Sequence, residues 1–267
     1  MANRLALHTW SLDSTPLREV LAVARRVGWE AVELRRLDFL RAREAGGSDG
    51  DVLGWVKATG LPVAAVGVEL GWMYAEGAER RRLLDVFAES CRWAAALGCA
   101  TVMSPVDRSG GDVARGAASL REVGDIARDH GVRLALEFNY RAERLNTLAR
   151  VREVSTRAAH PHCGLLIDTY HVERSGGGPR DLDDLDPAEI VYVQYSDVPR
   201  ENLDPADFTN RLPPGRGSVP FRKMFAALIA KGYSGAFSYE APNPAAWSRP
   251  PEEVAREALL ATRAVLP

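Results

Sequence analysis

Short apolar runs rich in β-branched residues alternate along the chain with longer stretches that carry apolar residues at helical spacing. The runs predict eight strands, at residues 5–8, 31–34, 62–68, 100–103, 132–137, 164–168, 190–195 and 236–240. The first stretch between strands is amphipathic, with an apolar face made of Leu17, Val20, Leu21, Ala24 and Val27. The chain is therefore predicted to alternate strands and helices from end to end.

Glycine follows several of the predicted helices just before the next strand, where a left-handed residue commonly ends a helix. This place is taken by Gly28, Gly98, Gly131 and Gly232. Eight such units in 267 residues predict an α/β fold, a (β/α)8 TIM barrel forming a single domain over residues 1–267. A doubly wound open sheet is less favoured, because its glycine-rich phosphate turn is not found. The sixth unit is the weakest, since residues 175–187 predict a loop or a short helix.

Four oxygen-bearing side chains stand where the last four predicted strands run out into loops. They are Glu137, Asp168, Gln194 and Glu240. Because the carboxyl ends of barrel strands open into one cavity, these side chains are expected to meet there. Carboxylates within apolar strands are costly to desolvate unless a positive partner meets them, and one divalent ion supplies that partner. An all-oxygen set favours Mg²⁺ or Mn²⁺ over Zn²⁺, which usually recruits His or Cys.

The overall charge gives no reason to expect a polyanionic partner. Lys and Arg total 34 against 36 Asp and Glu, for a net charge of −2, so nucleic acid and anionic membranes are not expected partners. We see no signal peptide and no apolar run long enough to span a bilayer, and we expect a cytoplasmic protein. The three cysteines lack CxxC spacing and are predicted to be buried free thiols. A small-molecule ligand is the expected partner.

Five segments together resemble the xylose isomerase-like TIM barrels grouped as sugar phosphate isomerases and epimerases. These segments read LALEFN, GLLIDTYH, VYVQYSD, RLPPGRG and GYSGAFSYEAPNP. The resemblance covers essentially the whole chain, and it implies that Glu137, Asp168, Gln194 and Glu240 are metal ligands. Glutamine as the third ligand is similar to hydroxypyruvate isomerases and bacterial 3-dehydroshikimate dehydratases, whereas ketose 3-epimerases have histidine there.

The region around Arg211 looks especially like the dehydratase segment. That resemblance also implies an arginine just after the third strand, to hold a substrate carboxylate. Residues 68–77 contain no arginine, so this chain departs from the dehydratase pattern. Because of this departure, we favour a metal-dependent isomerase or epimerase over the dehydratase. Its expected substrate is a small polyhydroxylated carbonyl compound. An abasic-site endonuclease, which shares the barrel, is a remote third alternative, since its zinc cluster needs many histidines and the chain has five.

The expected chemistry begins with removal of the proton next to a carbonyl that the metal polarises. Reprotonation then gives isomerisation or epimerisation, whereas loss of a β-hydroxyl gives dehydration. We expect Glu137 or Glu240 to act as the base and His171, three residues after Asp168, to shuttle the proton.

Other residues are expected at the rim of the same cavity. The predicted substrate contacts are Arg211, Glu69, Trp10, Asn139 and Trp72. Glu33 and Arg35, at the end of the second strand, are expected to shape the pocket, whereas His8, at the end of the first strand, is interpreted as a histidine of the barrel core. Tryptophans near the barrel mouth (Trp10, Trp72 and Trp247) suggest a surface for a homo-oligomer.

Overall fold

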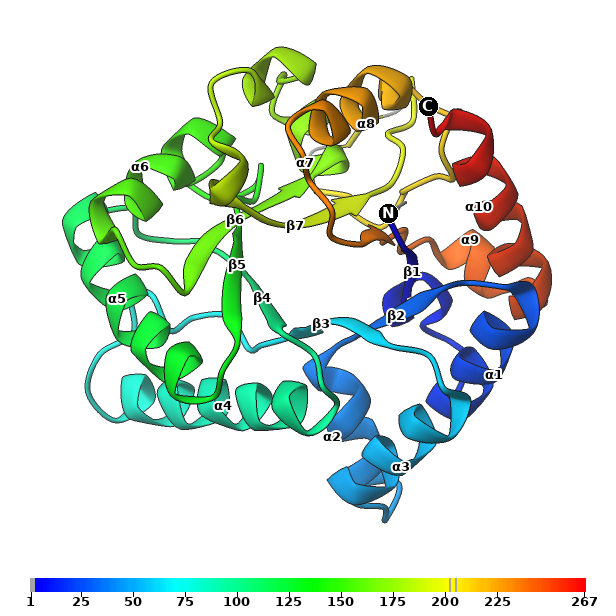
Figure 1. The fold of residues 1–267 in the computed structure, drawn as a ribbon, viewed down its shortest axis with the longest axis horizontal. Coiled ribbons are helices and arrows are strands. Elements are labelled where there is room, and N and C mark those ends of the chain that lie inside the picture. The colour runs from blue at the N-terminus through cyan, green and yellow to red at the C-terminus, as the bar shows by residue number, and fades with distance from the viewer. Residues whose placement is uncertain (1–2, 202, 205) are drawn as a thin grey trace.

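The structure is a computed structural model that describes residues 3–201, 203–204 and 206–267. Eight parallel strands follow one another in chain order, and β8 pairs with β1 to close a barrel. The strands are β1 (Leu5–His8), β2 (Ala31–Leu34), β3 (Val63–Gly67), β4 (Thr101–Pro105), β5 (Arg133–Glu137), β6 (Cys163–Asp168), β7 (Ile190–Tyr195) and β8 (Phe237–Tyr239). Figure 1 shows these strands at the centre with helices around them. The predicted (β/α)8 fold is confirmed.

The helices form the outer layer and connect successive strands (Figure 1). They are α1 (Leu17–Val27), α2 (Arg36–Glu44), α3 (Asp49–Thr59), α4 (Gly77–Ala96), α5 (Val113–Asp129), α6 (Leu148–Ala158), α7 (Thr169–Arg174), α8 (Phe221–Ala230), α9 (Pro244–Trp247) and α10 (Pro251–Val265). Two helices, α2 and α3, follow β2, where one helix per strand is the usual pattern of this fold. None of the described helices is long and apolar enough to cross a membrane.

The glycines predicted to end helices all have left-handed backbone conformations. Gly28 has φ 94° and is the C-cap of α1, and Gly232 has φ 85° just after α8. Gly98 and Gly131 follow α4 and α5 with φ 66° and 69°. A residue with a β-carbon is disfavoured at these angles, so glycine sets the point where each helix turns into the next strand.

The sixth unit also follows its prediction, since residues 175–187 contain only short 3-10 turns at Pro179–Leu182 and Pro187–Glu189. The eighth strand is shorter than predicted. It ends at Tyr239, and Glu240 is the first residue beyond it. The three cysteines are buried free thiols, as predicted.

Two apolar clusters hold the barrel together. The larger one lies between strands and helices and includes Val23, Phe87, Val151 and Phe225. The smaller one fills the barrel interior, with Ala65, Met103, Ala135, Leu166 and Tyr192. Because successive residues of a strand point to opposite sides, the residue two positions beyond each interior residue also points inward. The polar residues at the strand ends therefore form one layer above the interior cluster.

Candidate metal centre at the mouth of the barrel

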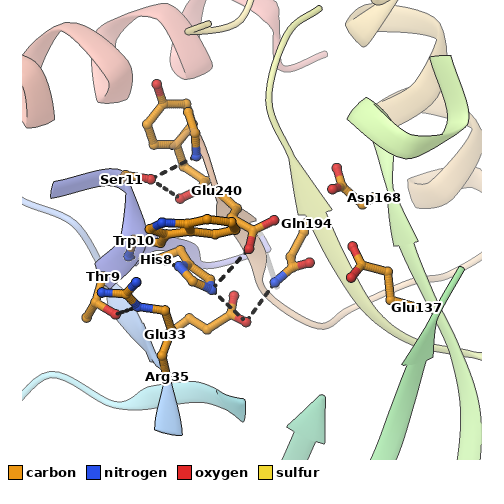
Figure 2. A network of polar contacts seen from close by, with 12 residues as sticks. His8, Thr9, Trp10, Ser11, Glu33, Arg35, Glu137, Asp168, Gln194 and Glu240 are labelled. Atoms are coloured by element: carbon orange, nitrogen blue, oxygen red, sulfur yellow. Dashed lines mark hydrogen bonds and ion pairs between the residues drawn. The ribbon is translucent and has the colours of Figure 1, made fainter. Parts of the chain in front are cut away.

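The strand-end side chains of β5, β6 and β7 share the interior face. Glu137 follows the interior residue Ala135 by two positions, and Gln194 follows Tyr192 in the same way. Asp168 pairs in register with Gln194 on the adjacent strand. Figure 2 shows Glu137, Asp168 and Gln194 reaching from β5, β6 and β7 into the same space as Glu240, which lies just after β8. The structure therefore brings together the four residues predicted as metal ligands.

These four side chains are almost completely removed from solvent. Asp168 and Gln194 are fully buried, and Glu137 and Glu240 are 4 % and 6 % exposed. The guanidinium of Arg211, itself buried, provides positive charge: its Nη1 lies 2.8 Å from Asp168 Oδ2 and 2.8 Å from Glu240 Oε2. One nitrogen in contact with both carboxylates shows that they are placed to share a single cation.

The other two predicted ligands have oxygens that accept no hydrogen bond within the described part of the chain. These are Glu137 Oε1 and Gln194 Oε1, both buried. The Gln194 amide is oriented by its other end, because Nε2 donates to Glu33 Oε1 at 2.8 Å. Buried oxygens without partners are rare and costly, and a hard divalent cation is the partner that an all-oxygen set fits. The residues present therefore fit a divalent metal ion.

His8 links the acidic residues on the β1 side of this centre. Its Nδ1 accepts a hydrogen bond from the Trp10 backbone N–H at 3.0 Å, which leaves Nε2 as the protonated nitrogen of the neutral ring. Nε2 lies 3.3 Å from Glu240 Oε1 and 3.5 Å from Glu33 Oε1 (Figure 2). Burial, reinforced by the charge of Arg35, keeps the pKa of His8 well below its usual value. The ring is therefore neutral near pH 7.

His171 lies on the opposite side of the centre, in α7. Its Nε2 is 3.5 Å from Glu137 Oε1 and 3.7 Å from Asp168 Oδ2, and Arg211 Nη2 is 3.4 Å away. Burial, followed by the charge of Arg211, holds the pKa of His171 well below its usual value. Ligand atoms of Glu137, Asp168 and His171 lie within 4.8 Å of one another, so this trio is an alternative ligand set for an ion.

Burial also raises the pKa values of the acidic groups. It is the main reason that the pKa of Glu137 lies well above its usual value, and the nearby Glu240 and Asp168 carboxylates add to the effect. Burial raises the pKa of Glu240 to about 7 even though Arg211 opposes the shift. For Glu33, burial and the charge of Glu240 raise the pKa to about 8. Clustered carboxylates of this kind are stabilised in their charged form by a cation.

A cavity of about 410 Å³ opens above the centre. Glu137, Glu240 and His171 line it, as do three of the predicted substrate contacts, Trp10, Asn139 and Arg211. Arg211 belongs to the acidic centre itself through its ion pairs with Asp168 and Glu240. The cavity is large enough for a small polyhydroxylated molecule.

Two predicted substrate contacts, Glu69 and Trp72, are not among the residues that line the cavity. Glu69 forms ion pairs with Arg82 at 2.6 Å and with the cavity residue Arg36 at 3.5 Å. Trp72 has no exposed surface and donates its indole N–H to Ser104 Oγ at 2.9 Å, within the apolar layer between strands and helices. Trp72 therefore offers no surface to a second copy of the chain, and the homo-oligomer stays a prediction.

Among the residues that line the cavity, sequence reasoning missed Arg108, Arg141 and Phe208. Arg108 follows β4, Arg141 follows β5 and Phe208 lies in the long segment between β7 and α8. Loop residues carry no periodic signal, so only the three-dimensional arrangement identifies them. Glu33 was expected to shape the pocket, but its contact with Gln194 was not foreseen.

The fold and the site define an α/β barrel with an acidic, metal-compatible centre at the carboxyl ends of its strands. Residues 21–265 match the family described as xylose isomerase-like TIM barrel, and the chain belongs to that family.

Among curated relatives, an inosose isomerase from Halalkalibacterium halodurans is 29 % identical over 140 residues, which is 52 % of this chain and 50 % of that protein. A 3-dehydroshikimate dehydratase from Pseudomonas aeruginosa is 30 % identical over 135 residues, which is 50 % of this chain and 21 % of the relative. The match thus spans half or less of each of these two proteins. A solved structure described as IOLI protein with a binding zinc atom has a TM-score of 0.88 at 20 % identity, covering 98 % of this chain and 97 % of that one. That likeness shows the shared fold.

Proposed function

We propose that this chain is a divalent-metal-dependent isomerase or epimerase of a small polyhydroxylated carbonyl compound. One observation carries the proposal: Glu137 and Gln194 present buried oxygens without hydrogen-bond partners, next to Asp168 and Glu240. This acidic centre lies directly at a cavity of about 410 Å³. The relatives named inosose isomerase support an activity on polyhydroxylated carbonyl compounds.

Mg²⁺ or Mn²⁺ is proposed as the ion, held by Glu137, Asp168, Gln194 and Glu240. When bound, it polarises the substrate carbonyl and stabilises the negative charge that forms when the neighbouring proton leaves. Three carboxylates and a dication leave a charge of −1, and the buried guanidinium of Arg211 brings the local sum to zero. A neutral centre of this kind has no net repulsion towards an electron-rich substrate oxygen.

The protein groups handle the proton. Glu137 and Glu240 both line the cavity, and we propose that one of them removes the proton next to the carbonyl. His171 is neutral, and its Nε2 lies 3.5 Å from Glu137 Oε1, so it is placed to relay the proton through small movements. Return of the proton to the neighbouring carbon gives isomerisation, and return to the opposite face gives epimerisation.

A dehydratase is the second candidate. The dehydratase reaction begins with the same removal of a proton, which is followed by loss of a β-hydroxyl. Its support comes from the two Pseudomonas relatives named 3-dehydroshikimate dehydratase, which are 30 % and 28 % identical over about half of this chain.

Proton NMR in D2O tests the proposal. The metal-loaded enzyme is incubated with hydroxypyruvate, an inosose, several ketoses and 3-dehydroshikimate, each beside an EDTA-treated control. Metal-dependent entry of deuterium next to a carbonyl, without loss of water, supports the isomerase or epimerase. The aromatic signals of protocatechuate would instead establish the dehydratase, and exchange that persists in EDTA would contradict the role of the metal.

A further inference from the structure

Five arginines line the cavity, and three of them are already neutralised by acidic side chains. Arg211 contacts Asp168 and Glu240 as described above. Arg35 lies 2.6 Å from Asp13, and Arg36 lies 2.7 Å from Glu89. The positive charges of these three arginines are balanced by acidic side chains of the protein, so they contribute little to the attraction of an anion.

The remaining two arginines, Arg108 and Arg141, have no acidic partner within the ranges that the structure describes. Arg108 is exposed and Arg141 is half-buried, and both line the cavity. The cavity thus carries two uncompensated positive charges.

Both arginines have a defined place at the mouth. The loops that carry them are joined, because Arg108 O accepts a hydrogen bond from Glu143 N at 2.9 Å. Arg141 N donates to the side chain of Asn139 at 3.0 Å, and its guanidinium carbon lies 4.5 Å from the centre of the Phe208 ring. Stacking on an aromatic face leaves the in-plane N–H groups of a guanidinium free to bind a ligand.

We propose that Arg108 and Arg141 form a subsite for an anionic group of the substrate, a carboxylate or a phosphate. The metal-loaded centre has no net charge, whereas the two arginines are uncompensated and attract such a group, so the substrate enters with its anionic end towards the loops after β4 and β5. Its carbonyl end then faces Glu137 and Glu240. The orientation of the substrate rests on the function proposed above, but the binding of an anion does not.

Calorimetric titration of the full-length, metal-loaded protein tests the subsite with three probes that lack an aldehyde or ketone group. Quinate carries a carboxylate, glucitol 6-phosphate carries a phosphate, and myo-inositol is neutral. The variants are Arg108→Gln and Arg141→Gln. Arg4→Gln is the matched control, because Arg4 is exposed and precedes β1 at the opposite end of the barrel.

We expect at least one anion to bind more tightly than myo-inositol, and each of the two variants to weaken that binding about tenfold, because a charge-assisted hydrogen bond is lost. Binding of myo-inositol is expected to stay unchanged. Preference for quinate assigns a carboxylate, and preference for glucitol 6-phosphate assigns a phosphate.

The subsite is overturned if neither anion binds the wild-type protein more tightly than myo-inositol, or if both variants bind the anions like Arg4→Gln. Failure of the proposed function has a different signature. It leaves the arginine-dependent binding of the anion intact while the NMR experiment shows no metal-dependent deuterium exchange.

Discussion

The side-chain N–H of Gln194 donates to the carboxyl group of Glu33 at 2.8 Å, and this contact decides which end of the amide faces the acidic centre. With Nε2 held by Glu33, the oxygen Oε1 remains without a hydrogen-bond partner and points away from that contact (Figure 2). Glu33 is itself fixed by the hydroxyl of Tyr192 at 3.0 Å. Glu33 thereby acts on the candidate metal centre without being one of its ligands.

Replacing Glu33 tests this positioning role. Glu33→Leu removes the acceptor, and the affinity for Mn²⁺ is expected to fall 10- to 100-fold, as is typical when a group that orients a ligand is lost. Glu33→Gln is the matched control, because its amide oxygen can still accept from Gln194 and should keep most of the affinity. Titration of EDTA-treated protein with Mn²⁺, followed by electron paramagnetic resonance, measures both. Equal affinities in the two variants would contradict the positioning role.

Removal of Arg211 is expected to lower the stability of the metal-free protein and to raise its affinity for the metal. Arg211→Met leaves Asp168 and Glu240 without their positive partner, so the metal-free protein should lose about 3–5 kcal/mol of unfolding free energy. The dication no longer competes with a guanidinium, and its affinity should rise about tenfold. Thermal unfolding with EDTA and with Mn²⁺ checks this, and the metal should restore most of the lost stability. A variant that Mn²⁺ does not rescue would argue that Arg211 serves the structure alone.

The raised pKa of Glu33 predicts how stability depends on pH in the metal-free protein. Glu33 has a pKa of about 8 in the folded protein, against an ordinary value of 4.5. Between these values the folded state holds a proton that the unfolded state has released, so its stability falls as pH rises, by up to about 1.4 kcal/mol per pH unit. Urea unfolding of wild type and Glu33→Gln from pH 5 to pH 9 checks the slope. The variant lacks this group, so a slope equal to that of wild type would refute the assignment.

The two carboxylates that line the cavity are expected to be essential for turnover. Glu137→Gln and Glu240→Gln keep the size of each side chain but remove a charged ligand and a base, so kcat should fall by a factor of about 10²–10⁴ or more. Circular dichroism should show that both variants remain folded. Glu69→Gln is the control, because Glu69 lies outside the cavity in ion pairs with Arg82 and Arg36. Turnover at the wild-type rate in Glu137→Gln or Glu240→Gln would refute the assignment.

The barrel and the acidic centre could be predicted because both follow from strand periodicity. Eight apolar runs define the strands, and the two-residue alternation places Glu137, Asp168 and Gln194 on the interior face. Glycines such as Gly28 mark the ends of helices, because few other residues adopt the required φ.

The two predicted substrate contacts that do not line the cavity are residues that leave the strands. Glu69 and Trp72 follow β3, where the chain turns outward, so the strand alternation no longer sets their direction. Trp72 packs in the apolar layer and Glu69 pairs with arginines. The engagement of Arg211 with Asp168 and Glu240, 43 and 29 residues away in sequence, depends on the path of a long loop. Its sequence contains no repeat from which this path can be read.

Anomalous X-ray diffraction from crystals grown with Mn²⁺ tests the central claim most directly. We predict one ion coordinated by Glu137, Asp168, Gln194 Oε1 and Glu240, with Nε2 of Gln194 still bonded to Glu33. An ion held by Glu137, Asp168 and His171 without Gln194 and Glu240, or the absence of an ion from this centre, would contradict the account.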